Sequence, residues 1–374
     1  MSADPAKTAS AVRYADRRAR ATRAVEEAGL AGLLVSPGPD LAYLIGHEPP
    51  PLERLTLLAL VPGYDPVLIL PALERPAAEA APGIADVELV VWADGDDPYG
   101  LASRTLGPGS YSVTDRTWAS HLIALERAVP DATFVAAGEA LPPLRAVKDE
   151  DEIRALRAAA RGADATFADV IQLPFVGRSE LEVAADIDRL LRLHGHRSVD
   201  FTIVGSGPNG ASPHHEAGER TIEPGDAVVM DFGGVGVDGY CSDITRTVFV
   251  GEPTPEQLRV FDVVREAQQV AFDAIRPAVT AQEVDRAARA VIGDAGYAEH
   301  FLHRTGHGIG LEVHEPPYIV EGDETALEPG MTFSDEPGIY LPGRFGVRIE
   351  DQVVVTADGA ERLNEASREP TVVA

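Results

Sequence analysis

Hydrophobic and polar positions alternate with two different periods in the first 135 or so residues. Residues 8–28 and 118–129 interleave charged and apolar residues at a helical period. Short apolar runs lie between them, at residues 32–36, 57–61, 66–70 and 87–93. The sequence PGYD at residues 62–65 separates two of these runs and is typical of a hairpin turn. The pattern predicts an α/β N-terminal region.

The remainder of the chain alternates capped helices with apolar segments. A helix is predicted from Asp149 to about Gln172, and three capping-box pairs precede further helices: Ser179 with Glu182, Thr254 with Gln257, and Thr280 with Glu283. Strand-rich segments fall at residues 201–206, 227–250, 301–313, 331–341 and 346–356. Helices that alternate with antiparallel hairpins indicate an α+β domain.

The length of 374 residues favours two domains over one. Residues 140–150 contain a Pro-Pro pair followed by the charged start of a long helix, which is typical of a linker. We therefore predict a smaller α/β domain over residues 1–140, a linker over 141–150 and an α+β domain over 151–374.

Composition limits the classes of partner and the compartment. The formal charge is −28, with 60 acidic residues against 32 Lys and Arg, so the net field repels nucleic acid and anionic membranes. Cys241 is the single cysteine, so there is no disulfide framework. The first residues, MSADPAKTAS, have no apolar core of a secretion signal, and no apolar run reaches membrane-spanning length. We expect a cytoplasmic protein.

Candidate chemistry is concentrated in five residues of the second half. Asp231, Asp243, His307, Glu336 and Glu350 all lie in apolar, Gly-rich segments. An unpaired carboxylate is costly to bury in such surroundings. A pair of divalent cations is the simplest compensation for four carboxylates that lie close together.

The spacing of the first two acids predicts that they face each other. Asp231 and Asp243 lie in two apolar runs separated by the turn-rich sequence GGVGVDGY, and residue 237 is equidistant from them. Residues equidistant from the turn of an antiparallel hairpin have Cβ atoms about 5 Å apart. Two carboxylates in this position repel each other unless a cation lies between them.

Glu336 and Glu350 repeat this arrangement around Gly343, which lies in the Pro-Gly turn of YLPGRFG. A β-bulge in either hairpin would shift its register by one residue. The sequence therefore predicts two hairpins that each present an opposed pair of acids.

Histidines gather in the segment HRTGHGIGLEVHEPP. His303 and His307 are four residues apart, and the glycines around them favour a strand or loop over a helix. Side chains four residues apart lie on the same face of a strand, so both imidazoles can reach one cavity.

Each of these residues taken singly has an ordinary structural interpretation, as a solvated acid or a satisfied histidine. On spacing alone, a metal site and a set of surface acids remain open alternatives. A set of four oxygen ligands and one nitrogen ligand suits Mn²⁺, with Co²⁺, Fe²⁺ or Zn²⁺ as other candidates. Paired metals are typical of hydrolysis of an acyl bond.

Competing motifs are incomplete. The DFG sequence at residues 231–233 occurs in kinases, but the glycine-rich loop, strand lysine and HRD segment of kinases are missing. The glycines at 233–239 are not followed by the Lys-Ser/Thr of a phosphate-binding loop. Cys241 is a possible nucleophile, although a buried structural thiol explains it equally well.

Five segments together resemble the Xaa-Pro peptidase branch, prolidase and aminopeptidase P, of the pita-bread metallopeptidases. They are GSGPNGASPHH, GDAVVMDFGGVGVDGYCSDITRTVFVG, HRTGHGIGLEVHE, EPGMTFSDEPGIYLPG and GVRIEDQVVVT, and they occur in the family's order over about 150 residues. PDLAYLIG and RAVKDEDEI are similar to segments of the creatinase-type N-terminal domain. Asp40, in the first of these, has a loop N-cap or turn as its simplest interpretation, with a substrate contact as the alternative.

The resemblance implies a role for each matching residue. Asp231 would chelate one metal and His307 the other, while Asp243 and Glu350 would bridge both. Glu336 would bind a metal and act as general base. The resemblance also assigns His214 to the substrate near the scissile carbonyl, His314 to the oxyanion, His303 to the active site and Arg348 to support of the ligands. All five ligand positions are intact, unlike those of the creatinase relatives.

The function implied is cleavage of the bond between an N-terminal residue and proline. That amide has no N–H and populates the cis form, so a dedicated site is chemically reasonable. We predict a dimanganese Xaa-Pro dipeptidase acting on a proline-containing di- or oligopeptide, and we expect a homodimer. The alternatives are an aminopeptidase P acting on longer peptides and a catalytically silent binding module with the same fold.

Overall fold

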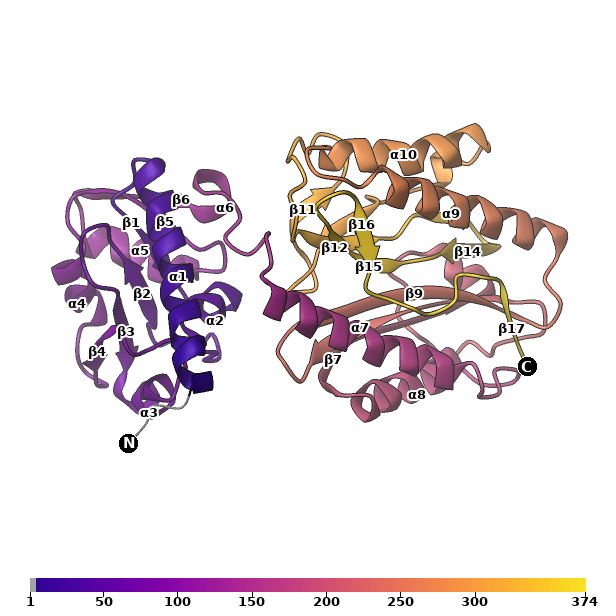
Figure 1. Ribbon diagram of the computed structural model, residues 1–374. Helices are drawn as coiled ribbons and strands as arrows, with labels where there is room; N and C mark the ends of the chain where they lie inside the picture. Colours follow the sequence, from indigo (N-terminus) through magenta and orange to yellow (C-terminus); the bar gives the residue numbers. More distant parts are fainter. Residues whose placement is uncertain (1–4) are drawn as a thin grey trace. The chain divides into compact units, whose positions relative to one another are not determined.

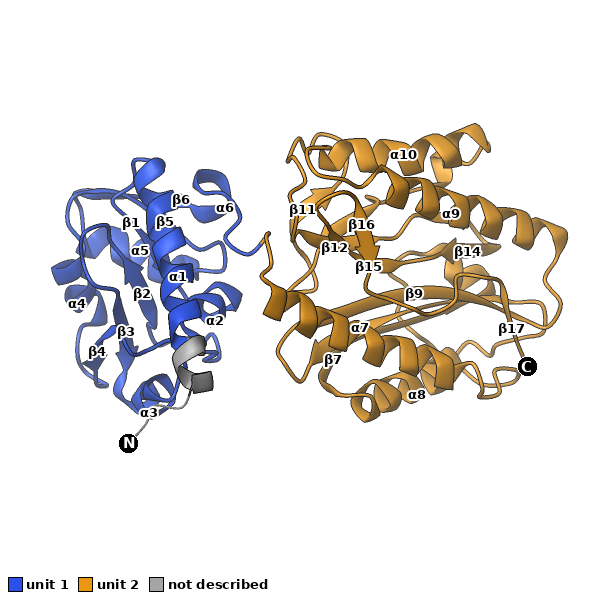
Figure 2. Ribbon diagram, in the orientation of Figure 1, with its two compact units in different colours: residues 1–145 blue, residues 146–374 orange. Residues whose placement is uncertain are grey.

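The computed structural model describes residues 5–374. It divides into two compact units, Met1–Arg145 and Ala146–Ala374 (Figure 2). No helix in the described part of the chain is long and apolar enough to cross a membrane.

The N-terminal unit contains a six-stranded sheet with strand order β4-β3-β2-β1-β5-β6 (Figure 1). Its strands are β1 (Gly32–Val35), β2 (Leu57–Leu60), β3 (Val67–Pro71), β4 (Glu88–Trp92), β5 (Gly109–Val113) and β6 (Ala132–Ala136). Its helices are α1 (Pro5–Glu27), α2 (Pro39–Ile45), α3 (Arg75–Glu79), α4 (Pro98–Thr105), α5 (Ala119–Ala128) and α6 (Ala137–Ala140). The predicted hairpin at residues 62–65 is confirmed, because β2 and β3 pair antiparallel with Leu57 opposite Ile69.

Asp40 is not the N-cap of α2, contrary to that part of the prediction. Gly38 is the N-cap, and Asp40 lies in the first turn. Its Oδ1 accepts a hydrogen bond of 2.8 Å from Nε of Arg145. A carboxylate is favourable at the first turn of a helix because the helix dipole is positive there, and the ion pair fixes Arg145 at the end of the unit.

The C-terminal unit contains two main sheets and a hairpin. The four-stranded sheet has the order β17-β9-β8-β7, and the five-stranded sheet has the order β11-β10-β12-β15-β16. Their strands are β7 (His196–Ser206), β8 (Ala227–Gly236), β9 (Cys241–Val250), β10 (Gly306–Gly308), β11 (Glu315–Ile319), β12 (Thr332–Asp335), β15 (Asp351–Val355), β16 (Ala360–Arg362) and β17 (Thr371–Val373). The hairpin pairs β13 (Gly338–Leu341) with β14 (Phe345–Arg348).

Two helix pairs cover these sheets (Figure 1). Helices α7 (Glu150–Val170) and α8 (Glu180–Leu193) share a core with β7, β8 and β9, which includes Phe167, Ile187 and Phe232. Helices α9 (Pro255–Ala274) and α10 (Ala281–Asp294) share a second core with the five-stranded sheet and the hairpin, which includes Phe261 and Phe333. The predicted α+β class is confirmed.

The helix starts agree with the capping boxes read from the sequence. Ser179, Thr254 and Thr280 are the N-caps of α8, α9 and α10. Each N-cap backbone N–H donates to the side chain three residues later, at 2.8 Å. The strand prediction for residues 301–313 is wrong in extent, because only Gly306–Gly308 forms a strand there.

Cys241 is buried at the start of β9, with 1% of its surface exposed. Burial raises the pKa of its thiol, which favours the protonated form over the nucleophilic thiolate. This environment agrees with the structural-thiol interpretation.

Candidate metal centre

The first acid pair lies on the β8–β9 hairpin, in a register that differs from the predicted one. Asp231 is opposite Thr245, and Asp243 is opposite Gly233. The two acids are therefore diagonal neighbours rather than direct partners. Because residues two apart on a strand point to the same face, both carboxylates still project from one side of the sheet.

The second acid pair follows the predicted register. Gly338 pairs with Arg348 and Leu341 with Phe345, so the hairpin is centred on Gly343. The same register continues in the β12–β15 pair, where Asp335 is opposite Asp351. Glu336 and Glu350 therefore lie opposite each other at the junction between the hairpin and the five-stranded sheet.

Glu350 joins the two acid pairs. Its backbone N–H donates to the carbonyl of Thr245 at 3.0 Å, and the hydroxyl of Thr245 donates to Glu350 Oε2 at 2.6 Å. Thr245 belongs to β9, the strand that carries Asp243. This bridge brings the junction of the second hairpin against the first, so four acids meet at one place.

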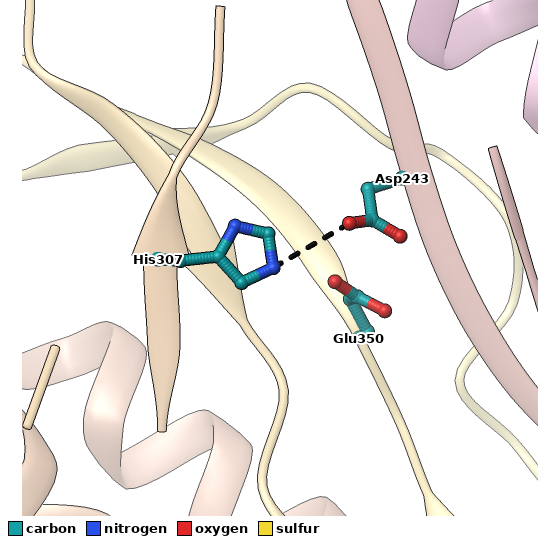
Figure 3. Close-up of side chains that lie close together, drawn as sticks. All are labelled: Asp243, His307 and Glu350. Carbon is teal, nitrogen blue, oxygen red and sulfur yellow. Dashed lines mark ion pairs between the residues drawn. The ribbon is translucent and has the colours of Figure 1, made fainter. Parts of the chain in front are cut away.

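His307 enters this cluster from β10. Its Nε2 lies 3.5 Å from Asp243 Oδ2 and 3.3 Å from Glu336 Oε1. Figure 3 shows the imidazole turned toward Asp243 and Glu350. Candidate ligand atoms of Asp243, His307 and Glu350 lie within 4.8 Å of one another. The Nδ1 of His307 is 3.2 Å from the carbonyl of Gly308, an acceptor, which leaves the lone pair of Nε2 for a ligand.

Glycines flank His307 because neighbouring backbone lies too close for a side chain. A Cβ on Gly306 would lie 1.8 Å from the carbonyl oxygen of Ser334, and one on Gly308 would lie 2.3 Å from that of Glu315. These approaches fix the position of the imidazole between its neighbouring strands.

The acids are buried and crowded. Burial, then the charges of Glu350 and Asp231, raises the pKa of Asp243 well above its usual value. Burial, then Glu336 and Asp231, does the same to the pKa of Glu350. Burial raises the pKa of Glu336 to about 7. Protons or cations must therefore compensate this cluster.

The donor set fits divalent cations. Asp231 Oδ1 and Glu350 Oε1 are buried and have no hydrogen-bond partner within the part of the chain described. Burial, then the neighbouring His314, lowers the pKa of His307 well below its usual value, so its imidazole is neutral and can donate its lone pair. Buried oxygens without partners beside a neutral imidazole are the environment of a hard or borderline metal ion.

Arg348 is the cation that touches the acids directly. Its guanidinium forms an ion pair with Asp231, and its Nε donates to the hydroxyl of Thr245 at 3.1 Å. Its Nη1 donates to the hydroxyl of Tyr340 at 2.8 Å and to the carbonyl of Pro213 at 3.2 Å. Arg348 therefore orients one acid while it occupies only one of that acid's oxygens.

The other predicted histidines lie around the same cavity, whose volume is about 770 Å³ and whose lining includes His214, His303 and His314. The ring centroid of His314 is 4.0 Å from that of His307. His303 lies in the loop before β10 rather than on a strand, so the shared-face argument is wrong for it. Burial lowers the pKa of His303 to about 3, and its Nε2 is 2.7 Å from the hydroxyl of Tyr340.

Several residues of this site were missed by sequence reasoning, among them Tyr340, Arg304 and the apolar wall residues Phe201, Ile203 and Val313. Tyr340 links His303 to Arg348, and burial raises the pKa of its phenol to about 12. Arg304 lines the cavity beside His303, and its guanidinium lies 4.5 Å from the ring centroid of Tyr318. The position of Arg304 next to a candidate histidine was the available signal, whereas Tyr340 gave none beyond its proximity to Glu336.

Comparisons with known proteins agree with this architecture. Residues 154–357 match the model of metallopeptidase family M24, and residues 17–147 match the creatinase/prolidase N-terminal domain. The chain is 49% identical to the probable dipeptidase PepE of Mycobacterium tuberculosis over 363 residues, 96% of each chain. It is 38% identical to the Xaa-Pro dipeptidase of Lactobacillus delbrueckii subsp. lactis, covering 93% of this chain and 96% of that one.

A solved structure shows the same similarity. The crystal structure of dipeptidase PepE from Mycobacterium ulcerans has 47% sequence identity and a TM-score of 0.93, covering 97% of this chain and 98% of that one. The predicted pita-bread fold with a creatinase-type N-terminal domain is therefore confirmed. With its carboxylate and imidazole cluster built on that fold, the chain belongs to metallopeptidase family M24.

Proposed function

We propose that this protein is a metal-dependent Xaa-Pro dipeptidase that hydrolyses the bond between an N-terminal residue and proline. The relatives named Xaa-Pro dipeptidase and dipeptidase PepE support this activity. The observation that carries it is the meeting of four acids, three of them buried and Glu336 partly buried, with a neutral imidazole on the wall of a cavity.

The proposed metal ligands are Asp231, Asp243, His307, Glu336 and Glu350, with Mn²⁺ preferred because four of the five donors are carboxylates. A bound pair of such cations lowers the pKa of water and stabilises developing negative charge on the substrate oxygen. Asp243 lies on β9 two residues before Thr245, whose hydroxyl donates to Glu350, so these two neighbouring acids would both help to hold the metal ions.

Glu336 is the proposed general base. Its Oε1 accepts a hydrogen bond of 3.2 Å from Ser334, and its pKa of about 7 without metal is close to that expected of an acid–base group at neutral pH. Its carboxylate takes a proton from the attacking water and delivers that proton to the proline nitrogen as the C–N bond breaks.

Two of the histidines on the cavity wall, His303 and His314, favour the neutral form. Burial lowers the pKa values of His303 and His314. We assign His314 to the oxyanion and His214 to the scissile carbonyl, both as hydrogen-bond donors. His303, Tyr340 and Arg348 form a chain of hydrogen bonds that ends on Asp231 and keeps that ligand in place.

Arg304 supports a dipeptide substrate over a longer one. Its guanidinium lines the cavity and forms no hydrogen bond or ion pair with the residues that the structure describes. A cation without an anionic partner, in a wall that also includes Phe201, Ile203 and Val313, suits a free carboxylate next to a proline ring. In a dipeptide this carboxylate follows directly on the proline, whereas a longer peptide has an amide there.

The decisive experiment compares Ala-Pro, Ala-Pro-Ala and Ala-Pro amide after loading with Mn²⁺. A dipeptidase cleaves Ala-Pro and leaves the other two intact, whereas an aminopeptidase P cleaves Ala-Pro-Ala. A silent binding module binds no divalent ion and cleaves none of them, which metal analysis detects separately.

Arg304→Gln tests the source of selectivity. We expect KM for Ala-Pro to rise about 10-fold to 100-fold, which is the loss of one charge-assisted hydrogen bond, with a smaller change in kcat. Arg259→Gln, at an exposed position of α9, is the matched control. An unchanged KM in Arg304→Gln would assign the carboxylate to another residue.

The predicted division into residues 1–140, 141–150 and 151–374, the homodimer and the cytoplasmic location stay predictions. Light scattering of the purified full chain checks the oligomeric state. Fractionation of the host cell checks the location.

A further inference from the structure

Glu180 is a fully buried carboxylate, with 0% of its surface exposed, and the proposed reaction does not use it. It is the first residue of α8, which packs beside β7 (Figure 1). Although burial favours the protonated form, hydrogen bonds from Ser206, His215 and Asn209 lower the pKa of Glu180 below its usual value. The carboxylate is therefore an acceptor for several donors at once.

Those donors belong to the two ends of one loop segment, residues 206–218. At the first end, Glu180 Oε1 accepts from the backbone N–H of Ser206 at 2.7 Å, from its hydroxyl at 2.6 Å and from Nδ2 of Asn209 at 3.0 Å. At the second end, Glu180 Oε2 accepts from Nε2 of His215 at 2.7 Å and from the backbone N–H of Gly218 at 3.2 Å. One side chain thus closes the loop.

His214 lies inside this loop, next to one of the anchors. It is exposed on the cavity wall, in a part of the chain with no strand pairing. Its two neighbours are held from opposite directions, because Pro213 accepts a hydrogen bond from Arg348 and His215 donates one to Glu180. A loop without such anchors samples many backbone conformations, and ordering it costs conformational entropy.

We propose that Glu180 is a positioning residue for the active-site loop and acts on the reaction through His214. It holds the backbone on both sides of this histidine, so the imidazole is in place before substrate arrives. The inference rests on the proposed function, since it takes His214 as a group that contacts the scissile carbonyl.

The first test is Glu180→Gln, which keeps the size of the side chain and removes its charge. An amide has one acceptor oxygen, so it cannot accept from both ends of the loop. We expect kcat/KM for Ala-Pro to fall about 10-fold to 100-fold, as for a reacting group displaced by about 1 Å. Glu182→Gln on the same helix is the matched control, because glutamine also completes a capping box.

His215→Ala is the second variant, and it removes one donor at a half-buried position without leaving a buried charge unpaired on α8. We expect a smaller loss than for Glu180→Gln. Amide hydrogen exchange of residues 206–218, read by mass spectrometry, should accelerate in both variants and stay unchanged in Glu182→Gln.

A double-mutant cycle then separates positioning from general damage. If Glu180 acts through His214, adding Glu180→Gln to His214→Ala costs less than about 2-fold. A full multiplicative loss in the double variant overturns the proposal, and so does faster loop exchange with unchanged kcat/KM.

These outcomes differ from a failure of the proposed function. Wild-type protein that does not cleave Ala-Pro refutes the function itself. Wild-type activity that His214→Ala leaves intact refutes the role of His214 and with it the positioning role. Activity that depends on His214 but not on Glu180 refutes the inference alone.

Discussion

Glu350 and Asp351 are neighbours in the chain and lie in opposite electrostatic environments. Glu350 points into the acid cluster, where one oxygen receives the hydroxyl of Thr245 and the other has no partner among the described residues. Asp351 instead lies among three arginine side chains and one amide, those of Arg246, Arg362, Arg368 and Gln268. Both are buried, with 1% of their surface exposed.

The environment of Asp351 is complete without any added ion. Its Oδ1 pairs with Arg246 at 2.6 Å, and its Oδ2 pairs with Arg362 at 3.2 Å and accepts from Gln268 at 2.9 Å. Nε of Arg368 is 3.8 Å away. Each oxygen of this carboxylate therefore has a protein partner.

The difference shows how a structural acid differs from a ligand acid. Where protein cations match the carboxylates, as around Asp351, the group stabilises the fold. Where carboxylates outnumber protein cations, as around Glu350, the excess charge marks a site for a metal.

Asp335 is a third buried acid of this region, and its environment differs from those of Glu350 and Asp351. It lies opposite Asp351 in the β12–β15 pair, and neither of its oxygens has a hydrogen-bond partner in residues 5–374. Burial raises the pKa of its carboxyl well above the usual value. Burial therefore favours the protonated form of this carboxyl.

The largest expected effect is at the ligand acids. Asp243→Ala should reduce kcat/KM for Ala-Pro by more than about 100-fold and remove the second metal, because even changes one shell beyond a metal cost up to about that factor. Mass spectrometric metal analysis and the peptidase assay measure both. Asp262→Ala, at an exposed position of α9, is the control, and an active Asp243→Ala would refute the bridging role.

The second prediction contrasts the two neighbours directly in metal-free protein. Asp351→Asn leaves buried arginines short of an anion and should lower the free energy of unfolding by about 3–5 kcal/mol. Glu350→Gln removes one of several repelling carboxylates and should leave stability equal or higher. Urea denaturation with a chelator measures both, and equal destabilisation would remove the distinction between the two acids.

The pH dependence of metal-free protein sharpens this contrast. The folded-state pKa of Glu336 is raised from 4.5 to about 7, so its contribution to stability is present below about pH 4.5 and is lost as pH rises through about 7. Relative to Glu336→Gln, wild type should lose about 3 kcal/mol between these limits. Thermal unfolding of both proteins at about pH 5 and about pH 8 measures the difference. Saturating Mn²⁺ should abolish it, and a gain for wild type at high pH would contradict it.

The smallest expected effect is at the edge of the compensated network. Arg368 is 28% exposed and more distant from Asp351 than Arg246 and Arg362 are. Arg368→Gln should therefore lower the free energy of unfolding by less than about 1 kcal/mol and leave metal binding unchanged. A loss as large as that of Asp351→Asn would show that compensation depends on all three arginines.

Local sequence signals predicted much of this fold correctly. The starts of α8, α9 and α10 follow from capping boxes that lie within four residues of sequence. The β13–β14 hairpin follows from the Pro-Gly turn at Gly343, which has a φ of 71°. Such signals depend on neighbouring residues, so one sequence is enough to read them.

The β8–β9 register shows where local signals fail. The connecting sequence holds several glycines, and symmetry alone centred the turn on residue 237. In the fold, Gly239 adopts a φ of 86°, and the turn is centred one residue later. Each glycine tolerates this conformation. The position of the turn therefore depends on the pairing of β8 with β7 and on the packing of the sheet.

By itself the sequence determined the starts of the long helices of the second half, the residue types of the metal centre and the family, because these depend on short motifs. Tertiary structure decided which groups meet at the site. The contacts of Tyr340 with His303, of Glu350 with Thr245 and of Glu180 with His215 join residues far apart in the chain. Glu350 and Asp351 are both acids in one apolar run, and only the packing of distant arginines distinguishes them.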